Sequence, residues 1–581
     1  MLNKLSVSLR ALRETPHPPD SLPEGKGARW DRFDSLFLLA CLGWAFLMWY
    51  GQFMHQYPDV ILGGDAANIT GFAAASDHPD WFRGDLLLSD PANFRIYATV
   101  HIPLIRALTH LTGNYSQSFN LILLPQAFLQ LFGFYVFGRQ LFKNRFWAVL
   151  LSLVNIAPFA INLEESWGLS YFAVPRQLFQ ALLPFLLALV LRTRKDWRIW
   201  PVWMALCGLL VYAHPVSTPA WAAALGVGIF SLTFTSTTAR WGWPRRLGWV
   251  ALCGFAFVSA ALPFILNYMN SHVQGASTNY DLVYSTIVES FPRDLLDTPA
   301  AVVQFVKITT RSGLLPLGLL GLGLLLFIRP RQQADLRLVL TWAGGILLMS
   351  VFIPWIEHSL ERALRLIPLE TELARGLRYI PFFFILFILW ALLELRDRLK
   401  PHWMSKAAAV SATVLVALWL VINPLRMETM RHILECWRSA QVLCSHPVPE
   451  TDIIHAVRQY TPPGSTIYSA LANQFDMAFS QSVRYLALRP LVYSFKDRGL
   501  LVYSNAETLA KWDQVHQELV DISTAYSERE RPRQWYNQAV SLGAEYMIAP
   551  NTFNLKPYAE LPVTLLFQDN RYLLFQIHPA Q

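Results

Sequence analysis

The feature that most constrains this fold is a long series of apolar runs, each near the roughly 20 residues that cross a bilayer as a helix. From residue 117 to residue 423 almost all of the chain consists of such runs, separated by polar connections of which 270–311 is the longest. In a membrane a run of this kind satisfies its backbone polar groups as a helix. We therefore predict about eleven transmembrane helices, at 33–51, 117–141, 146–162, 172–191, 198–213, 215–236, 247–269, 312–329, 336–356, 376–394 and 406–423.

The connections between these runs alternate in charge. Every second one is short and rich in lysine or arginine, which is typical of loops that stay in the cytoplasm. Those connections contain Lys143 and Arg145; Arg192, Arg194, Lys195 and Arg198; Arg240, Arg245 and Arg246; Arg329, Arg331 and Arg337; and Arg396, Arg398, Lys400 and Lys406. The tail 1–32 is basic too and lacks the apolar core of a signal peptide. We therefore predict a cytoplasmic N-terminal tail, a transmembrane domain over 33–423 and an extracytoplasmic C-terminal part.

The overall composition agrees with a membrane protein and excludes several other classes. Hydrophobic residues make up 54% of the chain and charged residues only 15%, which is too apolar for an ordinary soluble enzyme. The net charge of +8 is spread over the short basic connections and forms no single patch, so we predict no nucleic-acid partner. Five cysteines in 581 residues are too few for a fold held by disulfides.

One polar stretch, 52–98, interrupts the apolar pattern after the first run. A connection of this length between two spans is usually either functional or disordered. Its aromatic residues, among them Trp81, Phe82 and Phe94, offer apolar area that we expect to be buried on the membrane surface. The loop contains no glutamate but six aspartates: Asp59, Asp65, Asp77, Asp80, Asp85 and Asp90. We predict that this first external loop carries the catalytic carboxylate.

Among these aspartates we expect Asp65 to be the catalytic one. It follows two glycines in the segment GGDAAN, 63–68, and glycines let a backbone approach a ligand closely. A carboxylate held there could act as a general base towards an acceptor hydroxyl or help to hold a divalent cation. A simpler interpretation is that Asp65 caps the N-terminus of a helix that begins at Ala66. Asp59 and Asp85 are secondary candidates.

Several arginines stand at the predicted outer ends of spans, where the topology disfavours positive charge. These residues are Arg176, Arg311, Arg375 and Arg378. Because a guanidinium group binds phosphate through two parallel hydrogen bonds, converging arginines would form a cradle for a lipid phosphate at the outer leaflet. The alternative is that they contact lipid headgroups, or that they pair with Glu370 and Glu372.

Two further residues at outer span ends could complete such a site. Glu165 lies in the segment LEESWG, and His214 precedes a proline in AHPVS, where a histidine more often satisfies a local hydrogen bond. The histidines and cysteines lack the spacing of a zinc site, so we predict no structural or catalytic zinc. The chain also lacks a Walker A lysine motif and a Gly-x-Gly-x-x-Gly turn, so nucleotide binding by those routes has no support.

The composition changes after residue 424. We predict a neck over 424–450, in which Cys436 and Cys444 could form a local disulfide or remain thiols, and a small water-soluble α/β domain over 451–581. Short β-branched and aromatic segments alternate there with helical ones, which favours a mostly parallel sheet with covering helices. The expected strands are STIYSAL, PLVYSF, EYMIAP, PVTLLF and RYLLFQI.

Taken together, these features resemble the GT-C superfamily, membrane glycosyltransferases that take a sugar from a polyprenyl-phosphate carrier. The resemblance covers the architecture of most of the chain and the segments GDAAN, HPDWF, LLSDPANF, PRQ and AHP, which are similar to those of bacterial members. It implies that Asp65 acts as base or metal ligand and that Arg375 or Arg378 binds the carrier phosphate. The loop departs from the family pattern because it has no Asp-x-Asp or Glu-x-Asp, and the C-terminal domain has no Trp-Trp-Asp.

The resemblance implies an inverting transfer of sugar to an acceptor at the outer face of the bacterial plasma membrane, within the cell envelope. Its partners would be the polyprenyl-phosphate donor, membrane lipid and a glycan, lipid or protein acceptor. The site would hold Mg²⁺ or Mn²⁺ if the enzyme uses a metal. Two alternatives stay open: a transporter or flippase for a lipid-linked or anionic substrate, and a non-catalytic envelope assembly protein. The singled-out polar residues favour the enzyme, because they gather at outer span ends and not at mid-membrane.

Overall fold

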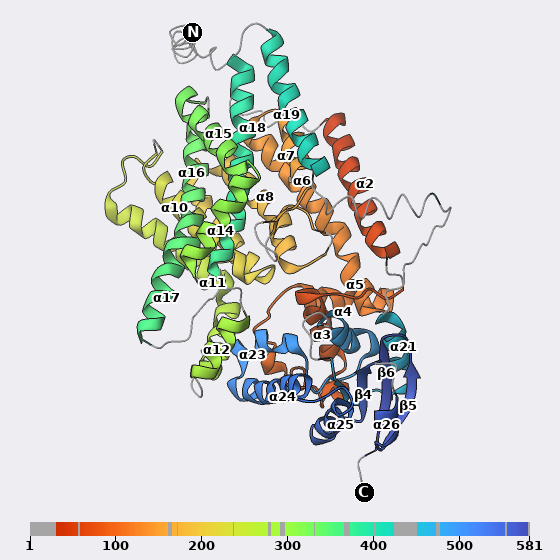
Figure 1. The fold of residues 1–581 in the computed structure, drawn as a ribbon. Coiled ribbons are helices and arrows are strands. Elements are labelled where there is room, and N and C mark those ends of the chain that lie inside the picture. Colours follow the sequence, from red (N-terminus) through yellow and green to blue (C-terminus); the bar gives the residue numbers. More distant parts are fainter. Residues whose placement is uncertain are drawn as a thin grey trace.

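A computed structural model gives the fold, and most of it is helical (Figure 1). The described residues are 31–55, 58–160, 166–170, 172–235, 237–276, 280–290, 297–330, 332–364, 372–398, 402–422, 438, 450–471, 477–551 and 555–578. Nearly all of the neck lies outside these ranges, including Cys436 and Cys444, and so does the tail before residue 31. The disulfide therefore stays a prediction.

Seven helices in the described part are long and apolar enough to cross a membrane, and a pair bent by 83° at its break would make an eighth. Three shorter apolar helices accompany them, so each predicted run contains a helix. The bundle consists of α2 (Arg32–His55), α6 (Leu123–Phe142), α7 (Arg145–Val154), α8 (Pro175–Thr193), α9 (Trp200–Leu209), α10 (Thr218–Leu232), α11 (Trp243–Ala276), α14 (Thr298–Arg311), α15 (Leu314–Ile328), α16 (Gln333–Leu347), α17 (Ile353–Leu364), α18 (Ile380–Arg398) and α19 (His402–Ile422).

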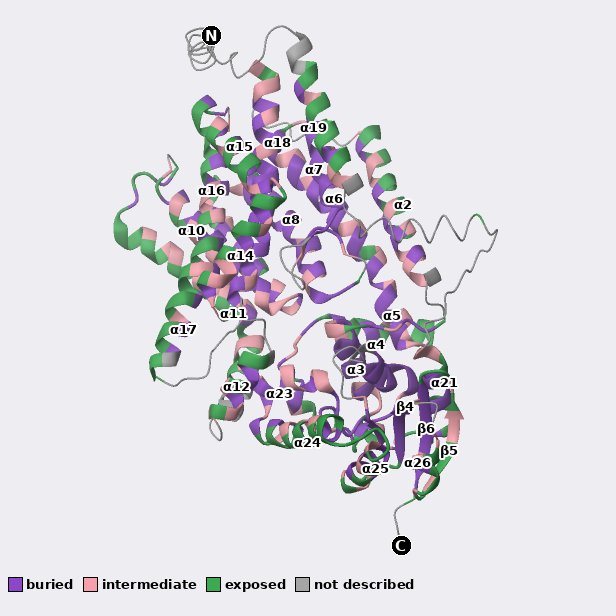
Figure 2. Cartoon of the chain, viewed as in Figure 1, coloured by how far each residue is buried: buried purple, intermediate pink, exposed green. Residues whose placement is uncertain are grey.

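The surface of this bundle is that of a membrane protein. Peripheral helices expose large apolar side chains, such as Leu36 of α2 at 65%, Phe255 of α11 at 69% and Leu320 of α15 at 60% (Figure 2). The central helices α6, α8 and α18 are buried within the bundle instead. A helix bundle that is apolar on its outside as well as inside needs lipid around it. The predicted fold class, a polytopic helical membrane protein, is confirmed.

One predicted span is shorter than expected. The run 146–162 forms a helix only to Val154. After it come two antiparallel strands of two residues each, β1 (Phe159–Ala160) and β2 (Ser166–Trp167). The Asn155 side chain donates to the Leu151 carbonyl at 2.7 Å and accepts from the Trp167 indole at 2.8 Å. This helix ends early because the Asn155 side chain makes its hydrogen bonds locally and Pro158 follows three residues later.

The basic connections meet at one end of the bundle. Arg194, after α8, pairs with Asp335 of α16 at 3.0 Å. Arg398 of α18 donates to the Arg329 carbonyl, after α15, at 2.8 Å. The Arg245 guanidinium lies 4.7 Å from the Trp241 ring centre, in the turn before α11. Connections that are far apart in the sequence thus form a single basic end.

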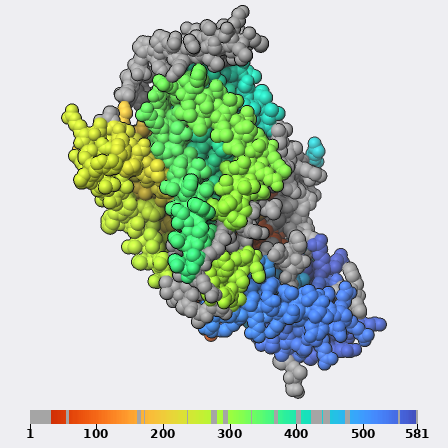
Figure 3. Space-filling view, turned by 60° about the vertical axis from the view of Figure 1, so that its left-hand side comes forward, coloured from red at the N-terminus to blue at the C-terminus, as the bar shows by residue number. Residues whose placement is uncertain are grey.

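The C-terminal residues cover the opposite end (Figures 1 and 3). Their elements are α21 (Glu450–Tyr460), β3 (Ile467–Ser469), α22 (Met477–Ser482), the π-helix η9 (Val483–Ala487), the 3₁₀ turn η10 (Phe495–Asp497), α23 (Arg498–Ser504), α24 (Ala506–Ala525), α25 (Arg531–Ser541), β4 (Tyr546–Pro550), α26 (Lys556–Ala559), β5 (Val563–Gln568) and β6 (Tyr572–Ile577). Helix α12 (Tyr280–Ser290), which follows α11, packs on α23 and α24 from the bundle side.

The sheet of this part is mixed, which corrects the expectation of a mostly parallel one. Its order is β3-β4-β6-β5, and only β3 and β4 run parallel. A tight turn explains the hairpin β5–β6, because the Asp569 carboxylate accepts from the backbone N–H groups of Arg571 at 2.6 Å and Tyr572 at 2.7 Å. The expected strand PLVYSF is reduced to one bridge, from Leu491 to Ile467.

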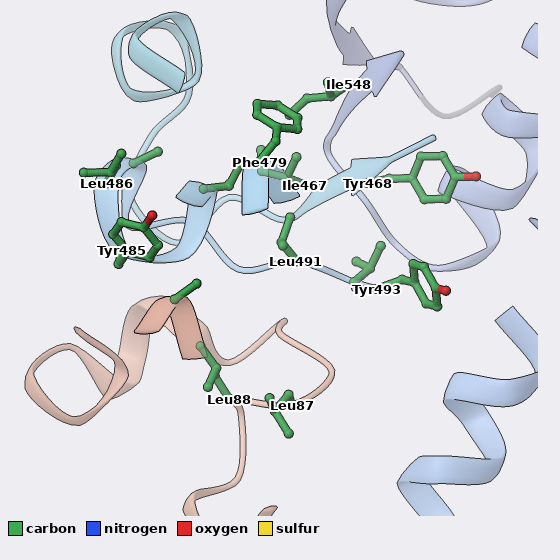
Figure 4. Packing of buried hydrophobic residues seen from close by; sticks show 14 of the residues in the cluster. Leu87, Leu88, Ile467, Tyr468, Phe479, Tyr485, Leu486, Leu491, Tyr493 and Ile548 are labelled. Carbon is green, nitrogen blue, oxygen red and sulfur yellow. The ribbon is translucent and has the colours of Figure 1, made fainter. Parts of the chain in front are cut away.

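The loop 52–98, predicted to be external, is part of the same hydrophobic core as the C-terminal residues. This loop forms α3 (Gly64–Asp77), the turns η1 (Pro79–Phe82) and η2 (Pro91–Asn93), and then leads to α4 (His101–Thr112) and α5 (Tyr115–Leu121). In Figure 4, Leu87 and Leu88 of the loop face Tyr485 and Leu491 across the interface. Burial of Phe82 and Phe94 in this core contradicts the expectation that the loop aromatics lie on the membrane surface.

Candidate functional site

Asp65 stands in the first turn of α3, at the end of the bundle that the C-terminal residues cover. Gly63 is the N-cap of this helix, and Gly64 has a φ of +56°, a left-handed conformation that favours glycine. The Asp65 side chain does not cap the helix, so the simpler interpretation of this residue is wrong. A carboxylate in the first turn of a helix is instead stabilised in its ionised form by the helix dipole.

Three cations from distant parts of the chain act electrostatically on Asp65. Burial raises the pKa of the Asp65 carboxyl, but positive charge nearby outweighs this effect and holds the pKa below its ordinary value. The strongest lowering comes from Lys496 of η10, followed by Arg176 of α8 and Arg375. Hydrogen bonding with the Tyr97 hydroxyl lowers the pKa further. Asp65 is therefore an ionised carboxylate at neutral pH.

These cations lower the pKa of Asp65 through their charge and not through a described ion pair. Within the described chain, no lysine or arginine forms an ion pair with its carboxylate, whereas Arg375 pairs with Glu372 at 2.7 Å. A direct pair would have occupied the acid in neutralising one base. Among the described residues, positive charge therefore acts on Asp65 without an ion pair that neutralises it.

A second group of polar residues adjoins the first one. Arg375 and Arg378 lie on the 3₁₀ turn η7 (Leu373–Tyr379), in which Gly376 packs so closely that an added Cβ would lie 2.1 Å from a serine Oγ of η6 (Leu348–Phe352). The buried Arg378 donates to the Ser217 hydroxyl at 2.8 Å. This close packing fixes the position of the turn that carries both arginines.

His214 lies next to this second group and caps the turn η5 (Pro215–Ser217). Its Nδ1 accepts from the Ser217 backbone N–H at 3.2 Å and lies 2.7 Å from the Ser217 hydroxyl. Burial lowers the pKa of His214 well below its ordinary value, and the charges of Arg378 and Arg176 add to the lowering. His214 is thus neutral, and its Nδ1 atom is used in local hydrogen bonding with Ser217.

The structure places the other predicted site residues elsewhere. Arg311 is exposed at the end of α14 and is not among the charges that act on Asp65. Glu165 lies outside the described residues. Of the secondary candidates, Asp59 accepts from Asn114 and lies 2.8 Å from a His455 ring nitrogen, so it links α5 to α21. The roles of Asp65, Arg176, Arg375, Arg378 and His214 in binding or catalysis stay predictions.

Sequence reasoning missed Lys496 and Tyr97. Tyr97 was visible only as one more aromatic residue of the loop, and Lys496 as one basic residue in a domain expected to be separate. The sequence signal that could have drawn attention to Lys496 is the charged segment FKDR. In it Lys496 directly precedes Asp497, which is fully buried in the structure. No spacing rule links that segment to Asp65, because the two meet only in the folded chain.

The described surroundings of Asp65 do not fit a divalent cation. Within the part of the chain that the structure describes, no group of three or more His, Cys, Asp or Glu could hold a metal ion. The groups that act on Asp65 are cations and a hydroxyl, which favour an anion there. We therefore derive no step through a metal.

Chelation tests this conclusion directly. EDTA in excess should leave at least about half of any sugar-transfer rate that the purified protein has, because no group of three or more His, Cys, Asp or Glu among the described residues could hold a hard cation. The rate is compared with and without added Mg²⁺ or Mn²⁺. Loss of transfer in EDTA with full recovery on Mn²⁺ would contradict the conclusion.

Comparisons with known proteins add a distant structural likeness. No protein-family model and no curated protein matches the sequence. Two of the similar solved structures are of ArnT. One crystal structure of ArnT from Cupriavidus metallidurans, bound to undecaprenyl phosphate, has a TM-score of 0.47 and 14% identity, and the match covers 94% of this chain and 100% of that one. The apo structure gives 0.47 and 13%, covering 94% and 99%.

The likeness extends along nearly the whole of both chains. At this TM-score and identity it carries no residue role and no activity over to the present protein. The function is therefore argued from the residues of this chain.

Proposed function

We propose that this protein is a membrane glycosyltransferase that moves a sugar from a polyprenyl-phosphate carrier to an acceptor hydroxyl. The observation that supports this proposal most is the gathering of one ionised carboxylate, Asp65, with the cations Arg176, Arg375 and Lys496 at one end of an apolar bundle. The phosphate of a lipid-linked sugar needs positive charge beside it, and its polyprenyl chain needs an apolar surface. The three cations offer the charge, and the apolar exterior of the bundle offers the surface.

The donor phosphate would lie among the cations. Arg176 stands in the first turn of α8, where the helix dipole is positive as well, and Arg375 lies on the fixed turn η7. Negative charge on the departing carrier phosphate grows as the bond between sugar and phosphate breaks. Fixed positive charge that stabilises a developing anion is usually the largest single contribution to catalysis.

Asp65 would take the proton of the acceptor. The acceptor oxygen forms a new bond to the anomeric carbon on the face opposite the phosphate, so the configuration inverts, and its proton passes to the carboxylate. A lowered pKa makes Asp65 a weak base. A weak base is sufficient here, because the acceptor hydroxyl becomes strongly acidic once its oxygen bonds to an oxocarbenium-like carbon. Tyr97 would hold the carboxylate in place.

The rival functions make different use of the same residues. A flippase would carry the lipid-linked sugar across intact, whereas the enzyme breaks it into free polyprenyl phosphate and a glycosylated acceptor. The test is to incubate the protein, reconstituted in nanodiscs, with polyprenyl-phosphate-linked sugars from a membrane extract and to measure released polyprenyl phosphate. Release that depends on the protein supports the proposal, and intact lipid-linked sugar after long incubation contradicts it.

The proposal also places the site outside the cytoplasm, in line with the basic end of the bundle facing inwards. In a parent with Cys436 and Cys444 replaced by alanine, Ser527→Cys should react with an impermeant maleimide on whole cells, and Lys195→Cys should react only after lysis. Both positions are exposed, so access depends on the side of the membrane. Labelling of the Lys195 position alone on intact cells would overturn the proposed orientation.

A further inference from the structure

Lys496 differs in origin from the other cations around Asp65. Arg176 and Arg375 belong to helical elements of the bundle, but Lys496 comes from η10 in the C-terminal part. Its side chain is half-buried, and in the part of the chain that the structure describes its ammonium has no ion pair and no hydrogen bond. The negative charge that acts with it is that of Asp65, which Arg176 and Arg375 share, so these three cations can take up the charge of a further anion.

A buried network fixes η10 to the loop that carries Asp65. Arg484 of η9 donates to both oxygens of Asp85, each at 2.8 Å, and to both oxygens of Asp497, at 2.7 and 2.8 Å. All three side chains are buried. Asp85 also accepts from the Leu491 backbone N–H at 2.8 Å. Because Asp497 is the residue after Lys496, this network holds the Lys496 backbone in register with the loop.

The other side of Lys496 is fixed as well. The Arg498 guanidinium lies 4.2 Å from the Phe495 ring centre and donates to the Glu289 carbonyl of α12 at 3.3 Å. Helix α12 follows α11 of the bundle, so this contact joins η10 to the membrane part of the chain. A lysine that is flanked by two such attachments has little freedom in its backbone, and only its side chain can adjust to a ligand.

We propose that Lys496 binds the phosphate of the lipid donor together with Arg176 and Arg375, so that the C-terminal part completes the donor site. This inference rests on the proposed function. A lysine suits the task because its ammonium is a compact charge on a flexible stem, which can follow a phosphate as it departs. The two arginines would fix the orientation of the phosphate through their planar hydrogen-bonding geometry.

The test measures binding of undecaprenyl phosphate to protein in phosphatidylcholine nanodiscs, with undecaprenol as the phosphate-free probe. Lys496→Met should raise the Kd for undecaprenyl phosphate about tenfold, and Lys496→Arg should stay within about threefold of the unaltered protein. Neither change should alter undecaprenol binding. The matched control is Lys511→Met, which removes an exposed lysine of α24 from the same part of the chain.

The outcomes separate this inference from the proposed function. If the unaltered protein binds both lipids equally, the proposed function fails. If it prefers undecaprenyl phosphate and Lys496→Met keeps that Kd, the inference fails while the proposed function stands. Thermal unfolding decides whether Lys496→Met is folded, and Lys496→Gln replaces it if it is not. A rise in Kd that Lys511→Met reproduces would also overturn the inference, because it would reflect net charge alone.

Discussion

Asp65→Asn is expected to slow sugar transfer by about 10²- to 10⁴-fold, the usual contribution of a general base. The substitution keeps the size and shape of the side chain but removes the charge that accepts the proton. Asp65 makes no ion pair with a described residue and does not cap α3, so the fold should not depend on its charge. Turnover is measured as released polyprenyl phosphate, and folding is measured by thermal unfolding.

Binding of the carrier distinguishes a base from a binding residue. Removing a negative charge beside Arg176, Arg375 and Lys496 should leave the affinity for undecaprenyl phosphate unchanged or raise it a few-fold. The matched control is Asp80→Asn, because Asp80 is an exposed aspartate of the same loop. Turnover by Asp65→Asn within about tenfold of the unaltered protein would remove the base from the mechanism.

Arg484→Met is expected to have the largest effect on stability. It would leave Asp85 and Asp497 buried side by side without their shared partner, and breaking a buried ionic network in this way costs about 3–5 kcal/mol. The same network attaches the C-terminal part to the loop, so these two regions should separate from each other more easily. We expect a lowered Tm in detergent and faster proteolysis of the C-terminal part.

An exposed arginine supplies the comparison for this prediction. Arg571 of the sheet hairpin pairs with Glu450 at 3.2 Å, and its side chain is 57% exposed. Arg571→Met should cost less than about 1 kcal/mol, as surface pairs usually do. Equal Tm values for the two variants would show that the Asp85–Arg484–Asp497 network is not what joins the two regions.

The membrane architecture could be predicted because its signals are local. Each apolar run specifies a helix by its own length, and the alternation of basic connections specifies which ends meet. The structure brings Arg194 to Asp335 and Arg398 to the Arg329 carbonyl, as that alternation requires. Asp65 could also be singled out for a local reason, because the two glycines before it indicate a backbone conformation that other residues rarely adopt.

The rest depends on contacts between distant segments, which one sequence does not specify. The loop aromatics were expected on the membrane, but Phe82 and Phe94 are buried in the hydrophobic core that the loop shares with the C-terminal residues. PLVYSF has the composition of a strand, yet the loop takes hydrogen bonds that a sheet neighbour would have used: Asp85 accepts from the Leu491 N–H, and the Leu491 carbonyl accepts from the Leu86 N–H. The charge of Lys496 acts on Asp65 only because the C-terminal part packs against the loop.

The most direct test of the central claim, that one anion site joins the bundle to the C-terminal part, is photocrosslinking with a polyprenyl phosphate that carries a diazirine beside its phosphate. Mass spectrometry of the labelled protein maps the attachment points. We predict crosslinks in peptides that contain Arg176, Arg375 and Lys496, all competed by unlabelled undecaprenyl phosphate. Crosslinks confined to the basic end of the bundle, near Lys195 and Arg398, would contradict the account.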